Sequence, residues 1–335
     1  MTTWRIPRSP LSRLALAVAL ACQSGAALAA DDFTFMTSWF AQAEHGGFYQ
    51  AQALGLYEKA GLDVTIRMGG PQVNSMQLLL AGEADAFSGF DFQILTGVGK
   101  GLPLVALGAV FQHDMNGLVT HPDVSGLDDI GDRTILMATS ARSSWWPWLS
   151  EKYGLSEDKV APYTFNLQPF VADPMAVQQG FGSSEPFGLT KLGAAYNFYT
   201  FSDEGYPPYG STVTTRRDVL EERADVLERF LKASMEGWKS YLADPAPGNA
   251  LIKEANPKMS DEQLVFAHHH LVETGAVTGG EAAEKGIGTI SAERWQATYD
   301  YMVHAGLIPV ETDWQAAFTT QLIDAIHVMP GDAAQ

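Results

Sequence analysis

The sequence predicts an α/β protein of two lobes with a ligand cleft between them. Short apolar strand patterns alternate with helix patterns in two successive blocks, and the pattern turns almost wholly helical from Asp218 onward. The length of 335 residues also fits two domains, at roughly 100 to 200 residues per domain. We expect lobe I to comprise residues 31–117 and 213–335, and lobe II to comprise residues 118–212.

Residues 1–29 have the pattern of a secretory signal peptide. Arg5, Arg8 and Arg13 lead into the apolar run LALAVALAC, which ends in GAALAADD, and cleavage after Ala29 fits this pattern. The apolar run is shorter than the about 20 residues that a spanning helix needs, and no later segment reaches that length. We therefore expect an exported, periplasmic protein that is soluble after cleavage.

The single cysteine and the net charge narrow the class of protein further. Cys22 lies inside the leader, with Ala19 where a lipoprotein signal typically has Leu, so a lipid anchor is the weaker alternative. The formal net charge is −18, and it becomes −21 when the three leader arginines are removed. Nucleic acids and anionic membranes require a basic surface, so this charge disfavours both as partners.

The first block of elements follows from hydrophobic periodicity. DFTFMTSWF and LDVTIRM predict strands, and GFYQAQALGLYEKAG between them predicts a helix that ends near Gly61. GGPQVNSMQLLLAGEA predicts a turn and a helix, and DAFSGF and LPLVALGAV predict further strands. This alternation predicts a mostly parallel sheet that helices cover on both faces.

The second block repeats the alternation. GDRTILMATS predicts a strand, SSWWPWLSEKYG a short helix, APYTFNL a strand and PMAVQQGF a helix. The stiff segment YPPYG is expected to cross between the lobes. From Asp218 onward, DVLEERADVLERFLKASMEGWKSYLAD, SDEQLVFAHHHLVET and SAERWQATYDYMVHAG predict helices that return to the first lobe.

Two stretches resemble a known family. The first combines Trp39, His45, Gly47, Tyr49, Ala51, Gly55, Tyr57, Gly61, Leu62, Asp63 and Val64. The second is NLQPFVADPMAVQQGFGSSEPF, from Asn166 to Phe187. Both resemble periplasmic solute-binding proteins of the NMT1/THI5-like superfamily, and the likeness covers about residues 33–250. It implies the two-lobed type II periplasmic binding fold, hinge closure on a small ligand, and an ABC permease with its ATPase as partners.

The candidate binding residues lie where strands end, because open α/β sheets bind ligands at this edge. Trp39 and Phe40 lie at the carboxyl end of the first predicted strand and either stack on a flat ligand or pack the lobe. His45 starts a helix and bonds either a ligand or the loop backbone. Glu185, in SSEP, either accepts hydrogen bonds from an exocyclic amine or caps the next helix. The other candidates are Ser88, Phe90, Asp91, Ser144, Trp145, Asn166 and Tyr209.

Patterns typical of enzymes and metal sites are weak or missing. The adjacent residues His268 to His270 point about 100 degrees apart on a helix, so we expect a solvated helix face there and no metal site. No G-x-S-x-G or H-E-x-x-H pattern occurs, and GGEAAEKGIG lacks the Lys followed by Ser or Thr of a phosphate-binding loop. Thiamine pyrimidine synthases of the superfamily carry a cofactor lysine, a histidine and a cysteine cluster, which RMGGPQVNSMQ and the mature chain lack. We therefore expect a monomeric binding protein without a cofactor, and no enzyme.

The expected ligand is a small aromatic heterocycle. Stacking faces come from Trp39, Phe90, Trp145 and Tyr209, while Glu185 offers an acceptor, and these suit a thiamine pyrimidine precursor or a related ring such as a flavin. The alternative is a small anion, namely a sulfonate, taurine or nitrate, with Arg142 in TSARSS as the cationic donor. The second alternative is an enzyme similar to thiamine pyrimidine synthase.

Overall fold

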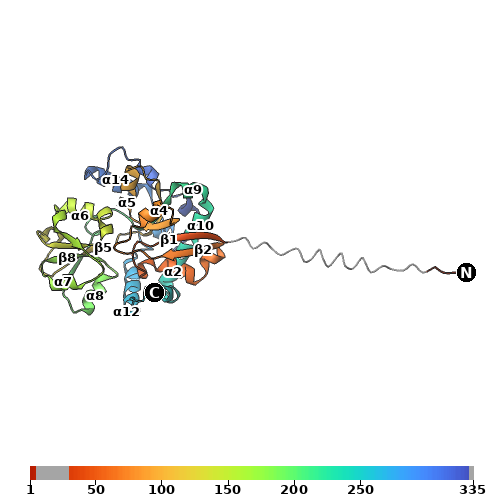
Figure 1. Ribbon diagram of the computed structural model, residues 1–335, viewed down its shortest axis with the longest axis horizontal. Coiled ribbons are helices and arrows are strands. Elements are labelled where there is room, and N and C mark those ends of the chain that lie inside the picture. Colours follow the sequence, from red (N-terminus) through yellow and green to blue (C-terminus); the bar gives the residue numbers. More distant parts are fainter. Residues whose placement is uncertain (5–29, 332–335) are drawn as a thin grey trace. The chain divides into compact units, whose positions relative to one another are not determined.

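The computed structural model describes residues 1–4 and 30–331. Apart from residues 1–4, the expected signal peptide lies outside the described residues, and so does Cys22. The folded unit that begins at Asp31 contains two five-stranded sheets with helices around them (Figure 1). None of the helices in the described part combines the length and the apolar character that crossing a membrane requires.

The two sheets have similar strand orders. The first has the order β2-β1-β3-β10-β4 and consists of β1 (Asp31–Met36), β2 (Leu62–Arg67), β3 (Ala86–Gly89), β4 (Leu104–Phe111) and β10 (Gly210–Arg216). The second has the order β7-β6-β8-β5-β9 and consists of β5 (Asn116–Thr120), β6 (Thr134–Met137), β7 (Val160–Pro162), β8 (Ala176–Phe181) and β9 (Asn197–Thr200). β10 and β5 run antiparallel to both of their neighbours, whereas the other pairs are parallel. Four of the five strands in each sheet therefore run in the same direction, as the expectation of a mostly parallel sheet requires, and one antiparallel strand makes each sheet mixed.

In each sheet, the antiparallel strand is the one at which the chain arrives from the other sheet. The chain leaves β4 at Phe111 and enters β5 at Asn116, and it returns from β9 at Thr200 to β10 at Gly210. YPPYG lies in the second crossing, as expected. Each entering strand starts at the edge where the parallel strands end, so it must run the opposite way. The expected lobe boundaries fall inside β5 and β10, and the lobe division stays a prediction.

Helices surround the sheets and form the C-terminal part. The first block contains α2 (Gly46–Ala53), α3 (Leu56–Lys59), α4 (Ser75–Leu80) and α5 (Asp91–Gly99), and the second contains α6 (Trp146–Tyr153), α7 (Gln168–Ala172) and α8 (Glu185–Lys191). After β10 follow α9 (Arg217–Glu222), α10 (Ala224–Ala243), α11 (Ala246–Ala255), α12 (Asp261–Thr274), α13 (Ala282–Lys285), α14 (Ala292–His304) and α15 (Gln321–Ile326). Short 3-10 helices are η2 (Ala43–His45), η3 (Leu127–Asp129), η4 (Thr139–Ser143), η5 (Glu157–Lys159) and η6 (Trp314–Ala317).

Two expected helices differ from the observed elements. The helix expected from Gly47 to Gly61 is divided into α2 and α3, because Gly55 has a φ of 64° and ends the first helix in a left-handed turn. PMAVQQGF is not a helix but contains β8, which pairs with β6 on one side and β5 on the other. The backbone hydrogen bonds of β8 are made to strands that are distant in the sequence. The local pattern therefore does not reveal this strand.

A pair of glycines allows α2 to pack closely on α10. A Cβ atom on Gly46 would lie 2.2 Å from the ring of Tyr241, and one on Gly47 would lie 2.1 Å from the ring of Trp238. Only glycine fits at these two positions without displacing α10. The contact anchors the start of α2, and it thereby holds the loop Trp39–His45 at the end of β1.

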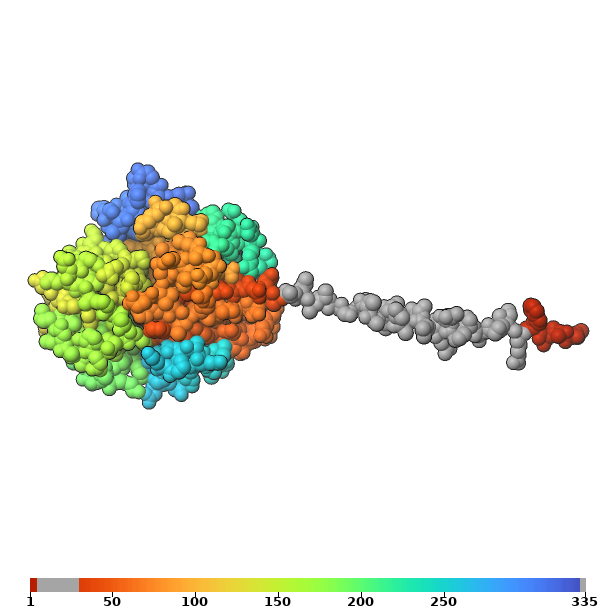
Figure 2. Space-filling view, in the orientation of Figure 1, coloured from red at the N-terminus to blue at the C-terminus, as the bar shows by residue number. Residues whose placement is uncertain are grey.

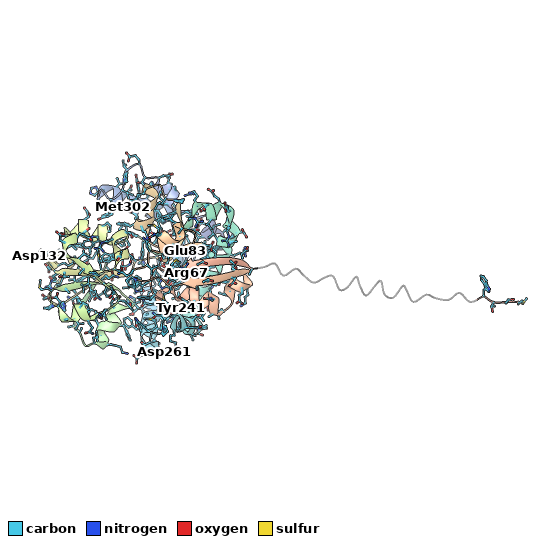
Figure 3. The ribbon with its side chains drawn as sticks, in the orientation of Figure 1. Arg67, Glu83, Asp132, Tyr241, Asp261 and Met302 are labelled. Carbon is cyan, nitrogen blue, oxygen red and sulfur yellow. The ribbon has the colours of Figure 1, made fainter. Side chains whose placement is uncertain are left out.

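The C-terminal helices return to the first sheet as expected, but α12 also contacts the second half of the chain. The rings of Phe187 in α8 and Phe266 in α12 lie 5.5 Å apart, and Lys191 pairs with Glu262. In Figure 3, Asp261 marks the start of α12 at the lower edge of the molecule. Asp132 lies at the left edge, in the half that contains the second sheet. Figure 2 shows α12 in cyan beneath the seam where the orange and yellow-green parts meet.

Candidate ligand-binding site

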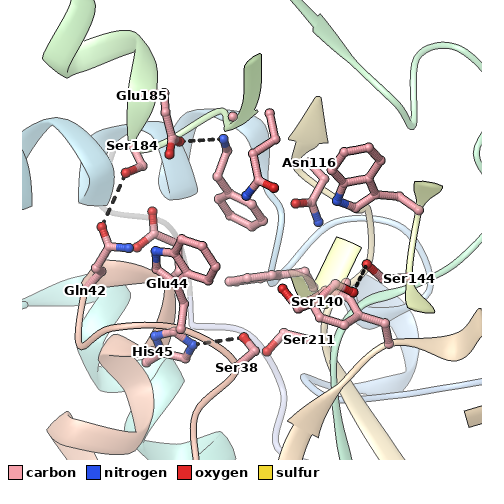
Figure 4. Close-up of a pocket in the computed structure, with 18 residues that line it drawn as sticks. Ser38, Gln42, Glu44, His45, Asn116, Ser140, Ser144, Ser184, Glu185 and Ser211 are labelled. Carbon is pink, nitrogen blue, oxygen red and sulfur yellow. Dashed lines mark hydrogen bonds between the residues drawn. The ribbon is translucent and has the colours of Figure 1, made fainter. Parts of the chain in front are cut away.

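One cavity lies where the strand ends of the two sheets face each other. It encloses about 760 Å³, counting the part that is open to solvent. Its lining comes from segments that follow β1, β3, β6 and β8, from the last residues of β4 and β8, and from the first residues of β5 and β10 (Figure 4). The eighteen lining residues are Ser38, Trp39, Gln42, Glu44, His45, Phe90, Phe111, Asn116, Ser140, Ser144, Trp145, Gln179, Gly180, Phe181, Ser184, Glu185, Gly210 and Ser211.

The structure brings six of the eleven candidate residues together around this cavity. They are Trp39, His45, Phe90, Ser144, Trp145 and Glu185. They come from four separate parts of the chain, which only the folded arrangement of both sheets places side by side. Their role in binding a ligand stays a prediction.

Three other candidates lie beside the cavity or away from it. Phe40 packs against Phe165, with ring centroids 5.9 Å apart. Ser88 bonds to the hydroxyl of Ser211 at 2.8 Å and lines a neighbouring hollow. Asn166 is exposed, and its Oδ1 accepts a hydrogen bond of 3.1 Å from the backbone N–H of Gln168 at the start of α7. The position of Asn166 is therefore that of a helix-start residue, not of a cavity residue.

Asp91 and Tyr209 belong to a buried cluster at the crossing segments. The backbone N–H of Tyr209 donates to Asp91 Oδ2 at 2.9 Å, and burial raises the pKa of Asp91 to about 7. The guanidinium of Arg294 lies 3.7 Å from the ring centroid of Tyr209. Arg294 also donates to the carbonyl of Gln112 at 2.7 Å and to that of Pro207 at 3.2 Å, so it bonds to both crossing segments. This cluster supports the connection between the sheets and does not line the cavity.

Glu185 is the best-supported polar group of the cavity. It starts α8 and is only 4% exposed. The hydroxyl of Tyr163 donates to Oε1 at 2.7 Å, and the backbone N–H of Phe181 donates to Oε2 at 2.7 Å. Burial raises the pKa of Glu185 to about 7. The two bonds fix the carboxyl group in place but leave further lone pairs on both oxygens, because each carboxylate oxygen accepts about two hydrogen bonds.

A second buried carboxyl group, that of Glu44, lies on the same side of the cavity in Figure 4. Its Oε1 accepts a hydrogen bond from the hydroxyl of Ser183, whereas Oε2 has no partner among the described residues. Burial raises the pKa of Glu44. The neighbouring His45 is also buried, which lowers its pKa to about 4 and keeps the ring neutral at pH 7. Its Nε2 lies 3.3 Å from the hydroxyl oxygen of Ser38.

Sequence reasoning missed several cavity residues for identifiable reasons. Gln179 and Phe181 belong to β8, which the local pattern predicts as a helix, so their position at a strand end was not apparent. Glu44 lies in the same loop as Trp39 and His45, and this shared loop is the signal that points to it. Asn116 begins a crossing strand, and no local pattern marks such a position.

The cavity combines aromatic rings with acidic groups, and its histidine, His45, is neutral at pH 7. Five lining residues are aromatic, namely Trp39, Phe90, Phe111, Trp145 and Phe181. Among the described residues that line it, none is Arg or Lys. Arg142, the donor considered for an anion, instead pairs with Glu157 on the exposed side of η4, with Nε 2.7 Å from Oε1. The arrangement suits a flat ligand that donates hydrogen bonds, because anions would meet two buried carboxyl groups without a compensating cation.

The three adjacent histidines of α12 point to different surroundings. His268 Nε2 lies 3.0 Å from the carbonyl oxygen of Tyr241, whereas His269 is exposed and lies 3.4 Å from Glu273. His270 is half-buried against Phe266. The run is therefore not a uniformly solvated face. No group of three possible metal ligands occurs within residues 1–4 and 30–331.

Two α/β sheets joined by two crossing segments around one cavity define the two-lobed fold of periplasmic binding proteins. The chain belongs to the NMT1/THI5-like family, whose model matches residues 42–247.

Three proteins illustrate what this chain is similar to. It is 22% identical over 305 residues to the riboflavin-binding protein RibY of Chloroflexus aurantiacus, covering 87% of this chain and 85% of the relative. It shares the fold of the alkanesulfonate-binding protein SsuA of Xanthomonas axonopodis pv. citri, with a TM-score of 0.62, 15% identity, and coverage of 86% and 98% of the two chains. The desulfurization enzyme DSZB also has this fold, with a TM-score of 0.54 and 12% identity over 88% of this chain and 98% of the enzyme. The fold alone therefore does not separate binding from catalysis.

Proposed function

We propose that this protein is the extracytoplasmic solute-binding component of an ABC importer. In this role it captures a small aromatic heterocycle, such as a thiamine pyrimidine precursor or a flavin, and delivers it to a membrane permease driven by an ATPase. Membership of the NMT1/THI5-like family and the two-lobed fold support the binding role. The expected signal peptide supports export to the periplasm, and the similarity to a riboflavin-binding protein supports a heterocyclic ligand.

The observation that carries this proposal is a cavity with aromatic walls and two buried carboxyl groups, whose described lining contains a neutral histidine but no Arg or Lys. Stacking on an aromatic side chain contributes roughly 1 to 3 kcal/mol per base-like ring. Trp39 and Phe90 come from the first sheet's side, and Trp145 from the second. The free lone pairs of Glu185 accept a hydrogen bond from an exocyclic amine or a ring N–H.

Binding and delivery follow from the two-sheet arrangement. The lining residues come from both sheets, so a ligand completes its contacts only when both sides close around it. Only the difference in ligand affinity between the closed and the open form drives this closure. The closed form is the one that the permease recognises.

Two other functions fit the family and the fold, but the residues of this chain oppose them. A sulfonate, taurine or nitrate receptor is suggested by the likeness to SsuA, but the two carboxyl groups and the surface position of Arg142 oppose it. A reaction similar to that of thiamine pyrimidine synthases is the other alternative. RMGGPQVNSMQ, the loop that holds the cofactor lysine in those enzymes, has no lysine.

A binding screen tests the proposed function. Isothermal titration calorimetry with the mature chain would compare a 4-aminopyrimidine that carries 2-methyl and 5-hydroxymethyl groups, riboflavin, taurine and nitrate. We expect heat of binding with at least one of the two heterocycles and none with the anions. Binding of only taurine or nitrate would contradict the proposal.

A further inference from the structure

A second hollow adjoins the main cavity. It encloses about 520 Å³, counting its open part. Its walls come from the loop between β2 and α4, from the end of β3, from α5 and from η4. Ser38, Phe90 and Ser140 line both the hollow and the main cavity, so the two spaces meet at these residues.

The lining of the second hollow differs in chemistry from that of the main cavity. Nine of its twelve residues are uncharged and polar, and none of the twelve is charged. Several of these groups are available to a ligand. The side-chain amide of Gln93 and the hydroxyl of Ser140 have no hydrogen-bond partner among the described residues, and Gln72 has only a 3.4 Å contact with Thr139.

So many amide and hydroxyl groups in one hollow suit a ligand substituent that carries several hydroxyl groups. Each ligand hydroxyl donates one hydrogen bond and accepts up to two, which suits the mixed donors and acceptors of Ser, Thr, Asn and Gln. A phosphate or carboxylate would find no cationic side chain in either space. Since Phe90 lies at the junction, a ring stacked in the main cavity can extend a substituent directly into the hollow.

We propose that the second hollow is a subsite for a neutral, polyhydroxylated chain attached to the aromatic ring of the ligand. This inference rests on the proposed function, because it assigns the ring to the main cavity. It narrows the substrate class to ring compounds with a sugar-like or polyol chain and without phosphate.

Three flavins test the inference, because they share the isoalloxazine ring and differ in the substituent on N10. Calorimetry with the mature chain would compare riboflavin, which has a ribityl chain, lumiflavin, which has only a methyl group, and flavin mononucleotide, whose chain ends in phosphate. We expect riboflavin to bind at least about tenfold more tightly than lumiflavin, since two or more hydrogen bonds to the ribityl chain are gained. We also expect riboflavin to bind more tightly than flavin mononucleotide.

A variant locates the effect in the hollow. Gln93→Leu removes an amide that lines only the second hollow, so it should reduce the preference for riboflavin over lumiflavin about threefold or more. The affinity for lumiflavin should stay unchanged. Gln321→Leu, at an exposed position of α15, is the matched control and should alter neither affinity.

The outcomes separate this inference from the proposed function. Equal binding of riboflavin and lumiflavin overturns the subsite and leaves the heterocycle proposal intact. Binding of the aminopyrimidine without binding of any flavin does the same. Tighter binding of flavin mononucleotide overturns the neutral character of the chain. Binding of only taurine or nitrate overturns both proposals.

Discussion

Replacement of Glu185 by Gln tests the acidic anchor of the cavity. The change keeps the shape of the side chain and removes its charge. In the wild type, Tyr163 and Phe181 each donate one hydrogen bond of 2.7 Å to the carboxylate, which also lines the cavity. The amide oxygen of Gln can still accept from Phe181, while the rotatable hydroxyl of Tyr163 can accept from the new NH₂ group. The fold should therefore be retained.

The substitution should reduce the affinity for the ligand. A hydrogen bond to a charged group contributes about 1.5 to 3 kcal/mol, so the dissociation constant should rise roughly 10- to 150-fold. Titration calorimetry at pH 8, where a carboxyl group with a pKa of about 7 is mostly ionised, measures this change with the aminopyrimidine and with riboflavin. For the wild type, the affinity for these donors should fall as the pH decreases through about 7.

The control is Glu157→Gln, which removes an exposed carboxylate that pairs with Arg142. It should leave the ligand affinity unchanged. If Glu185→Gln folds normally by circular dichroism and binds both heterocycles as tightly as the wild type, Glu185 is not a ligand anchor. A gain in affinity for nitrate or taurine alone would instead favour the anion alternative.

Further substitutions probe the walls, the packing and the pH dependence. Trp39→Ala should weaken heterocycle binding by about 1 to 3 kcal/mol in calorimetry, with Trp39→Phe retaining most of the affinity. Gly47→Ala should lower the free energy of unfolding in urea by about 1 to 3 kcal/mol or more, because the new methyl group meets the ring of Trp238, and unchanged stability would refute this packing argument. Arg294→Met should cost about 2 to 3 kcal/mol of stability, since carbonyls of both crossing segments lose a charged donor. Burial raises the pKa of Glu185 from 4.5 to about 7, so the folded state binds more protons than the unfolded state, and stability should increase as the pH falls from 8 to 6.5. Glu185→Gln should reduce this increase by about 1 kcal/mol, and an identical pH profile for both proteins would contradict the raised pKa of Glu185.

Local patterns predicted most elements of the first sheet correctly. The strands near residues 31–36 and 62–67 and the helices after Asp218 follow from periodicity, because one face of each is buried. β8 could not be recognised in this way. Its residues Ala176, Val177 and Gln178 are all buried between two neighbouring strands, so no alternation marks them as a strand.

The candidate site shows the same limit. Trp39, Phe90 and Glu185 were predictable because each follows a strand or begins a helix, where α/β folds place ligands. Phe111, Asn116 and Ser211 were not, because they lie at strand ends that only the chain crossing brings to the cavity.

The sequence by itself determined the alternation of elements, the acidic composition and the glycine pair that α2 needs to approach α10. These properties depend on local chemistry and on residue size. Only the tertiary structure decided which strands run antiparallel, which rings share the cavity, and that the carboxyl groups of Glu44 and Glu185 are both buried there. The burial of these side chains and their proximity in the cavity arise from contacts between segments more than a hundred residues apart. Local sequence patterns do not indicate which of these distant segments come together.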